Sequence, residues 1–236
     1  WFHWSSLAIA RTKCDVLKIC KAHNYDLYEH TNPQYYKKYI LKRIEGVYPI
    51  SKIGYDEIKR QTNMNNVAVY YLGSHNTNDI SFTDVKKSKT INIVSCSRIV
   101  LVKRINLIID ALSKVNIKIN WVHFGDGSLY NDIKNYAKTK LDSKKNITYE
   151  LKGYVKNDDV LDYYNKNYKK IDFFVNTASM EGIPVSIMES SSYGIVPIAT
   201  NVGGTYELVD KYLIENDSDE KIVDEIVRIL LKYQEL

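Results

Sequence analysis

The chain has 236 residues, of which 44% are hydrophobic and 26% are charged, and its formal net charge is +5 at pH 7. This composition is ordinary for a soluble globular protein of one large or two modest domains. No apolar run reaches the ~18–20 residues that a membrane span needs. The mild positive charge permits an anionic ligand or a membrane surface, and we expect no nucleic-acid partner.

The chain contains three cysteines, Cys14, Cys20 and Cys96, and no C-x-x-C pair. An odd number without such a pair argues against a disulfide framework or a zinc site and favours a reduced, cytoplasmic setting. Because the sequence begins at Trp1 rather than Met, we expect it to be a fragment or a processed chain.

Strand and helix patterns alternate weakly over residues 1–76. We expect strands at 15–23, 46–51 and 67–73, and helices at 34–44 and 51–61. Three strands are too few for a complete Rossmann-like domain, so this segment is predicted to be a partial one. The polar, aperiodic residues 77–90 form the expected linker to a second domain at 91–236.

From residue 91 onward the alternation is clean, which predicts an α/β domain with a parallel, doubly wound sheet and helices on both faces. The expected strands are 92–97, 118–125, 146–153, 171–178 and 195–200. The expected helices are 104–115, 129–140, 157–167, 184–194, 204–210 and 219–235. Asn157 is the expected N-cap of its helix. Asp217, followed by Glu220, fits a capping start for the last helix.

Small or charged residues follow all five strands of this second half. In an open parallel sheet, ligands bind outside the carboxyl ends of the strands, so these residues are expected to line one edge. Arg98 and Lys103 follow the first strand and could grip a phosphate or diphosphate, although a solvated turn explains them too. Gly125, Asp126 and Gly127 follow the second strand. They would allow a close backbone approach to a ligand, or simply a tight turn.

The sharpest signal is MEGIPVSIME at residues 180–189, which follows the fourth strand. Pro184 suits the first turn of a helix, and Gly182 leaves room in front of it. The exposed N–H groups at that helix start favour an anion or a sugar hydroxyl. Glu181 and Glu189 can each accept two hydroxyl hydrogen bonds, which is the usual way to hold a sugar or a ribose.

Other polar residues give weaker signals. Asp217-Ser218-Asp219 has the D-x-D pattern of metal-dependent sugar transferases, but it precedes the last helix, so we do not assign it to a site. Lys37, Lys38, Lys42 and Arg43 lie on a predicted helix that could rest on an anionic membrane, although a solvated face is the simpler interpretation. No Walker A sequence, G-x-S-x-G or H-E-x-x-H occurs.

The segments SRIVLVKRINLIIDAL, WVHFGDG, GYV and MEGIPVSIMESSSYGIVPIATNVGGTYELV together resemble the donor-binding half of a group 1 (family 4) GT-B glycosyltransferase of the bacterial surface-polysaccharide type. The resemblance is strong over residues 91–210, and the E-x7-E segment is its most specific mark. Residues 1–76 resemble the later part of the acceptor half, without its opening strands and glycine-rich loop. The resemblance therefore implies a GT-B-like fold with a truncated acceptor half, so that activity is expected of the full-length enzyme.

The resemblance also implies a role for each matching residue. Arg98 and Lys103 match the basic pair that neutralises the donor diphosphate, so that no metal and no cofactor is needed. Glu181 matches the carboxylate beside the transferred sugar, and Glu189 the ribose-binding carboxylate. The remaining donor-side matches are Gly125, Asp126, Gly127, Gly153, Val155, Gly182, Ile183, Pro184 and Val185. His3 and His23 fall in regions that resemble the acceptor side.

The function that this resemblance implies is the retaining transfer of a hexose from a UDP- or GDP-sugar to a glycan or polyprenyl-linked acceptor. The expected location is the cytoplasm, at the inner face of the plasma membrane. Two alternatives stay open: a nucleotide-sugar epimerase of GT-B fold, and a non-catalytic fragment that binds nucleotide sugars. An epimerase would convert the donor without an acceptor, and the non-catalytic fragment would transfer nothing.

Overall fold

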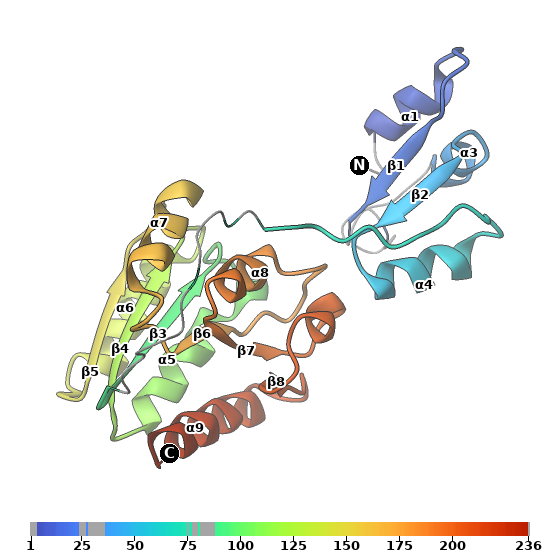
Figure 1. Ribbon diagram of the computed structural model, residues 1–236. Coiled ribbons are helices and arrows are strands. Elements are labelled where there is room, and N and C mark those ends of the chain that lie inside the picture. Colours follow the sequence, from blue (N-terminus) through green and yellow to red (C-terminus); the bar gives the residue numbers. More distant parts are fainter. Residues whose placement is uncertain are drawn as a thin grey trace. The chain divides into compact units, whose positions relative to one another are not determined.

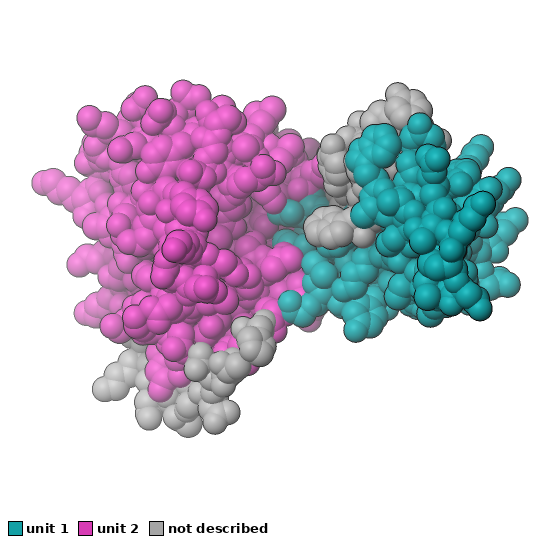
Figure 2. Space-filling view, turned by 90° about the horizontal axis from the view of Figure 1, so that it is seen from above, with its two compact units in different colours: residues 1–73, 181–184, 203–207 teal, residues 74–180, 185–202, 208–236 magenta. Residues whose placement is uncertain are grey.

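The computed structural model describes residues 4–23, 27, 36–74, 76, 80 and 88–235. The chain divides into two compact units, drawn in different colours in Figure 2. Unit 1 comprises residues 1–73, 181–184 and 203–207, and unit 2 comprises residues 74–180, 185–202 and 208–236. Most of the expected linker at 77–90 lies outside the described residues.

Unit 2 is built on a parallel sheet, as the alternating pattern predicted. Its described strands are β3 (Thr90–Cys96), β4 (Lys118–Phe124), β5 (Ile147–Leu151), β6 (Phe173–Asn176), β7 (Val196–Thr200) and β8 (Leu213–Ile214). They lie in the order β5-β4-β3-β6-β7-β8, and every neighbouring pair is parallel. The two-residue strand β8 was not predicted. The order reverses between β3 and β6, which is where doubly wound folds bind ligands.

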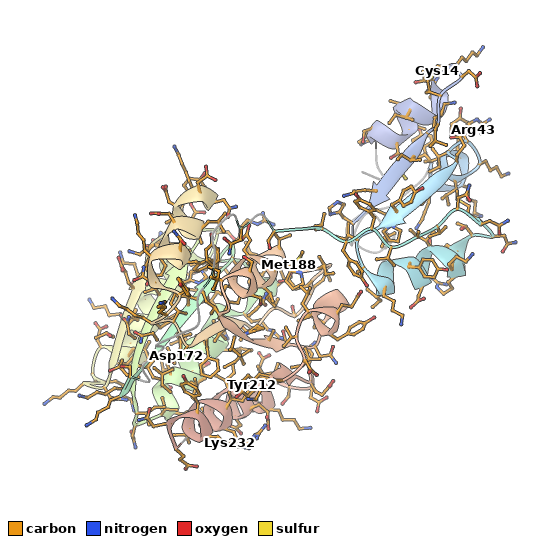
Figure 3. All side chains as sticks on the ribbon, in the orientation of Figure 1. Cys14, Arg43, Asp172, Met188, Tyr212 and Lys232 are labelled. Carbon is orange, nitrogen blue, oxygen red and sulfur yellow. The ribbon has the colours of Figure 1, made fainter. Side chains whose placement is uncertain are left out.

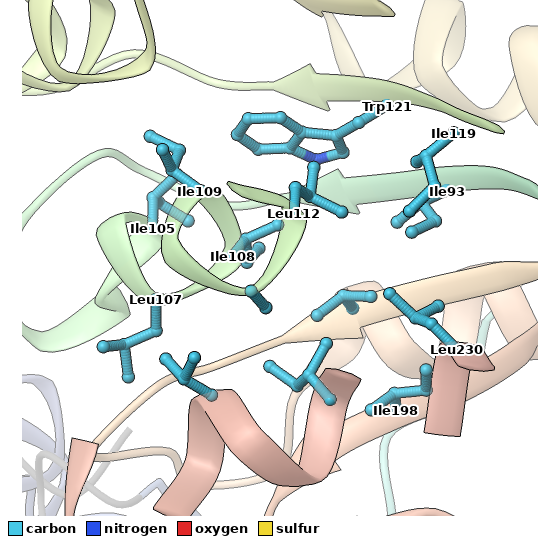
Figure 4. Close-up of a cluster of buried hydrophobic side chains, with 14 of the residues drawn as sticks. Ile93, Ile105, Leu107, Ile108, Ile109, Leu112, Ile119, Trp121, Ile198 and Leu230 are labelled. Carbon is cyan, nitrogen blue, oxygen red and sulfur yellow. The ribbon is translucent and has the colours of Figure 1, made fainter. Parts of the chain in front are cut away.

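Helices cover both faces of this sheet (Figure 1). One face packs against α5 (Ile105–Lys114), α6 (Tyr130–Leu141) and α9 (Asp219–Glu235), and the other against α7 (Asn157–Asn167) and α8 (Val185–Ser192). Alternate strand residues serve the two faces: Ile93 packs in the cluster shown in Figure 4, whereas Val94 packs on the opposite side. Successive strand side chains point to opposite faces, and here both sets are apolar. Both faces of the sheet are therefore buried under helices.

Unit 1 contains a pair of parallel strands, β1 (Ile19–Ala22) and β2 (Gly46–Pro49). Its helices are α1 (Trp4–Arg11), α3 (Lys37–Leu41) and α4 (Lys52–Gln61). The predicted strand at 67–73 is wrong, because only Val67 forms an isolated bridge, to Val47. Val67 is buried in the core of this unit, but Tyr70 and Tyr71 are exposed, so the segment has no continuous buried face to hold it in a sheet.

The structure corrects three other local predictions. Lys37 does not lie on a solvated face: it is buried, and its Nζ donates to the Leu27 carbonyl at 2.9 Å. Asn157 is the first residue of α7, and the N-cap is Lys156, whose side chain makes no capping bond. At α9 the Lys221 amide donates to Ser218 Oγ at 3.3 Å, while the Asp217 carboxylate pairs with Lys221 Nζ.

Candidate functional site

The turn after β3 is packed tightly against the Gly125-Asp126-Gly127 turn after β4. The Ser97 amide donates to the Phe124 carbonyl at 3.0 Å, and the Ile99 amide to the Asp126 carbonyl at 2.7 Å. Gly125 (φ 133°) and Gly127 (φ 159°) leave no room for a Cβ, which would overlap the carbonyl oxygens of Ser97 and Ile99. The close approach that these glycines allow is therefore to the chain itself. It fixes the backbone on either side of the exposed Arg98.

Lys103 ends the 3-10 helix η1 (Leu101–Lys103), which lies beside the end of β6. The Ser179 amide donates to the Val102 carbonyl at 2.8 Å. The Thr177 hydroxyl donates to the Lys103 carbonyl at 3.1 Å. These bonds join segments far apart in sequence, and they place the second basic residue where the chain leaves β6 and continues to Glu181.

Glu189 lies in α8, the helix that Figure 3 marks with a label on Met188. Its carboxylate Oε1 accepts a hydrogen bond from Asn157 Nδ2 at 3.1 Å, which links α8 to the start of α7. Partial burial raises the pKa of Glu189, and the Asn157 hydrogen bond opposes that rise. Among the described residues, no donor hydrogen-bonds to the second carboxylate oxygen, so Glu189 has acceptor capacity left for a ligand.

The charges of Lys103 and Glu189 both influence the thiol of Cys96. Cys96 is the last residue of β3, and burial raises its pKa to about 11. The Glu189 carboxylate raises this pKa further, whereas the Lys103 ammonium lowers it. A cation from the turn after β3 and an anion from α8 therefore both lie near the carboxyl end of this central strand.

The turn after β5 meets the turn after β4 at the same edge. The Gly125 amide donates to the Gly153 carbonyl at 2.8 Å. Gly153 takes a left-handed conformation (φ 69°). Val155 is half-buried against the core beneath α7 and α8. Tyr154, which separates Gly153 from Val155 in the sequence, is exposed. The structure thus brings together the predicted residues that follow β3, β4 and β5.

The Glu181–Pro184 stretch belongs to unit 1, together with η2 (Gly203–Glu207). The Gly204 amide donates to the Gly182 carbonyl at 2.6 Å. A Cβ on Gly203 (φ 54°) would overlap the Glu181 carbonyl oxygen, so this contact requires glycine. Ile183 and Pro184 are buried, Glu181 is half-buried, and Val185 is exposed as the first residue of α8.

Within unit 1, the η2 segment also caps a helix. Both carboxylate oxygens of Glu207 accept from the Lys52 amide at 2.9 Å, at the start of α4, and Oε2 also accepts from the Tyr71 hydroxyl at 2.9 Å. A carboxylate at a helix N-terminus is stabilised by the free N–H groups and the helix dipole. His23, half-buried, directly follows β1, and His3 lies outside the described residues.

Sequence reasoning missed two parts of this site. Asn157 was interpreted as a helix cap, although its amide supports Glu189. The sequence pattern assigns no role to Arg104, next to Lys103. Among the described residues, no group of three or more His, Cys, Asp or Glu side chains is placed to hold a metal ion. No helix in the described part of the chain is long and apolar enough to cross a membrane.

Comparison with known proteins defines the class to which this fold and site belong. The family model for glycosyl transferases group 1 matches residues 76–236, and the chain belongs to this family. The predicted resemblance is therefore confirmed.

Individual relatives agree with this assignment. A stretch of 113 residues is 33% identical to the Escherichia coli UDP-Gal:alpha-D-GlcNAc-diphosphoundecaprenol alpha-1,3-galactosyltransferase, covering 46% of this chain and 27% of that protein. The fold is similar to that of the lipopolysaccharide outer core galactosyltransferase WaaB (TM-score 0.68, 18% identity, 87% of this chain and 57% of WaaB). It is also similar to Anabaena HepE in complex with UDP and glucose (TM-score 0.67, 17% identity, 92% of this chain and 62% of HepE). The predicted GT-B-like α/β fold is thus confirmed, and the chain spans only part of the length of each relative.

Proposed function

We propose that the protein to which this chain belongs transfers a hexose from a nucleotide diphosphate sugar to an acceptor hydroxyl. The observation that carries the proposal is that Lys103, in the turn after β3, and Glu189, in α8, both lie close to Cys96, the last residue of β3. A cation for the diphosphate and a carboxylate for the ribose are what a nucleotide sugar requires at the edge of a parallel sheet. Membership of the glycosyl transferases group 1 family supports the same reaction class.

The donor that we propose is a UDP-sugar. The support is the E. coli relative, whose name specifies UDP-Gal. The nucleotide would bind along the turns after β3, β4 and β5, with its diphosphate at Arg98 and Lys103. Arg98 can offer two parallel N–H donors to a phosphate, and Lys103 a point charge. Gly153 and Val155 would lie near the base, which backbone groups can contact.

The proposed reaction breaks one bond and forms one. The bond from the anomeric carbon to the diphosphate oxygen breaks, and the nucleoside diphosphate leaves with that electron pair. The acceptor oxygen bonds to the anomeric carbon on the same face, and its proton passes to the departing phosphate oxygen. Negative charge grows on the diphosphate during this step, so fixed cations at Arg98 and Lys103 lower the barrier.

The remaining residues hold the sugar in place. Glu181 would accept hydrogen bonds from hydroxyls of the transferred hexose and so orient its anomeric carbon. Backbone N–H groups after Gly182, at the start of α8, would favour the anionic side of the donor. Glu189 would accept the ribose hydroxyls with the oxygen that Asn157 does not use. His23 is proposed on the acceptor side.

The proposed acceptor is a glycan or a polyprenyl-linked sugar of a cell-surface polysaccharide. The names of the E. coli relative and of WaaB refer to a diphosphoundecaprenol-linked sugar and to lipopolysaccharide, respectively. An acceptor with a lipid anchor would require the enzyme to contact the membrane surface, and the cytoplasmic face is the location that we propose.

Titration calorimetry with UDP, GDP and their hexose conjugates tests the donor site. Arg98→Ala and Lys103→Ala should each weaken binding by about tenfold to a hundredfold, since each removes a charge-assisted hydrogen bond. Lys118→Ala is the matched control, because Lys118 is an exposed cation at the start of β4, at the end of the strand away from the predicted donor site. Equal affinity in all three variants would show that the site has been misplaced.

Product analysis of the full-length enzyme tests the reaction. A retained anomeric configuration and activity that survives EDTA are expected. Inversion, or activity that only Mn²⁺ restores, would contradict the proposed chemistry. Donor epimerised without any acceptor would instead identify an epimerase.

A further inference from the structure

Arg104 has a backbone conformation that needs an explanation. Its φ of 46° and ψ of 45° make it the single non-glycine residue with positive φ in the described part of the chain. Side chains of L-residues disfavour this left-handed region, so surrounding contacts must stabilise it. Arg104 also sits at a junction, because it ends η1 and precedes the first residue of α5.

The guanidinium group supplies those contacts through four hydrogen bonds. Nε donates to the Thr177 carbonyl at 2.8 Å and Nη2 to the Ala178 carbonyl at 3.1 Å, both just beyond the end of β6. Nη2 also donates to Asn216 Oδ1 at 2.6 Å, and Nη1 forms an ion pair with Asp219 at 3.0 Å. The side chain is only 15% exposed.

The backbone of Arg104 is tied to the same place. The Thr177 hydroxyl lies within hydrogen-bond distance of two carbonyl oxygens, that of Lys103 at 3.1 Å and that of Arg104 at 3.0 Å. Thr177 thus accepts from the Arg104 side chain through its carbonyl and donates back through its hydroxyl. This reciprocal contact fixes the turn after β3 against the chain that leaves β6.

We infer that Arg104 is a positioning residue that holds Lys103 at the donor site. Its planar fork joins three segments, namely the turn after β3, the exit of β6 and the start of α9, at the cost of a strained backbone. This inference rests on the proposed function, because it gives Arg104 a role in donor binding. Within the described part of the chain, the Arg104 guanidinium hydrogen-bonds to none of the predicted donor-binding side chains, so its effect on a nucleotide passes through Lys103 and the β6 exit.

Three substitutions separate the side chain from the strained backbone. Arg104→Ala removes the hydrogen bonds and keeps the strain, Arg104→Gly removes both, and Arg104→Lys keeps the charge without the fork. Lys114→Ala is the matched control, since Lys114 forms an exposed ion pair between α5 and α9 at Asp224. Each variant is measured by thermal unfolding, by amide hydrogen exchange at Val102–Arg104 and Thr177–Ser179, and by UDP binding.

We expect faster exchange at both segments and roughly tenfold weaker UDP binding in Arg104→Ala and Arg104→Gly. Arg104→Gly should unfold at a higher temperature than Arg104→Ala and still bind UDP as poorly; Arg104→Lys should recover part of the affinity. Exchange that stays unchanged, or UDP affinity in Arg104→Gly equal to that of the wild type, would overturn the inference. If the wild-type chain binds no UDP, GDP or ADP, the proposed function is refuted. The hydrogen-exchange data would then still test whether Arg104 fixes the turn after β3 against the exit of β6.

Discussion

Glu189 offers a direct test of how the site divides its work, through the substitution Glu189→Gln. Asn157 donates to one carboxylate oxygen of Glu189, which leaves the other for a ligand. Gln keeps an oxygen for Asn157 and places its NH₂ group where the ligand hydroxyls would donate. The variant therefore loses about one hydrogen bond to a charged acceptor, or about 1.5–3 kcal/mol. UDP affinity should fall about tenfold to a hundredfold.

The same substitution should increase the stability of the unliganded protein, although it weakens UDP binding. Partial burial raises the pKa of Glu189, so the folded chain keeps this proton to higher pH than the unfolded chain does. The stability from this group is present at low pH and is lost as pH rises through the folded-state pKa. Glu189→Gln removes that loss, so its urea midpoint should exceed that of the wild type at pH 7. The difference should disappear in acid.

Calorimetry and urea unfolding across pH measure both effects. Glu225→Gln is the control, because the Glu225 side chain on α9 is half-buried and already pairs with Arg228. UDP affinity within twofold of the wild type in Glu189→Gln would refute the ribose assignment. A lower urea midpoint at pH 7 would refute the account of its burial.

Three further predictions concern the framework of the site. Gly125→Ala should lower stability by about 1–3 kcal/mol, because the new Cβ overlaps a neighbouring carbonyl at positive φ, whereas Gly73→Ala, with open space around it, should be nearly neutral in the same urea titration. His123 is buried, and burial lowers its pKa from 6.5 to about 4. Stability should therefore fall as pH drops from about 6.5 to about 4, and His123→Gln should flatten this slope; an equal slope in both proteins would contradict it. Glu207→Ala should cost about 0.5–2 kcal/mol, because the Lys52 amide at the start of α4 loses its carboxylate acceptor while Ser51 still caps the helix, and unchanged unfolding would show that this bond contributes nothing.

Local sequence patterns predicted most elements of unit 2 because each is long or strongly periodic. The helix at 104–115 appears as Ile105–Lys114, and the strand at 118–125 as Lys118–Phe124. In unit 1 the strand at 67–73 failed, because strand formation depends on a paired neighbour and a buried face rather than on residue type alone. The two-residue β8 has too few residues to form a pattern.

Side-chain partners were harder to predict than elements. Asn157 is a residue type that often caps helices, but its side-chain amide donates a hydrogen bond to Glu189 on another helix. Lysine is usually a surface residue, but the Lys37 ammonium is buried and donates a hydrogen bond to the Leu27 carbonyl in the core of unit 1. In both cases a contact between separate segments outweighs the local preference. For the buried Lys37 the reason is that a buried polar group is stable only where it finds a partner.

The sequence by itself determined the parallel sheet, the sheet edge at which the predicted donor-site residues after β3, β4 and β5 gather, and the Gly-Ile-Pro stretch before α8 between two glutamates. These follow from chain order and residue type, since parallel strands joined by helices all end at one edge. Tertiary structure alone decided what holds those residues there. Arg104 connects the turn that carries Lys103 to the end of β6, across 73 residues of chain from Arg104 to Thr177. No local pattern encodes such a bond, because both partners acquire their positions only when the sheet has formed.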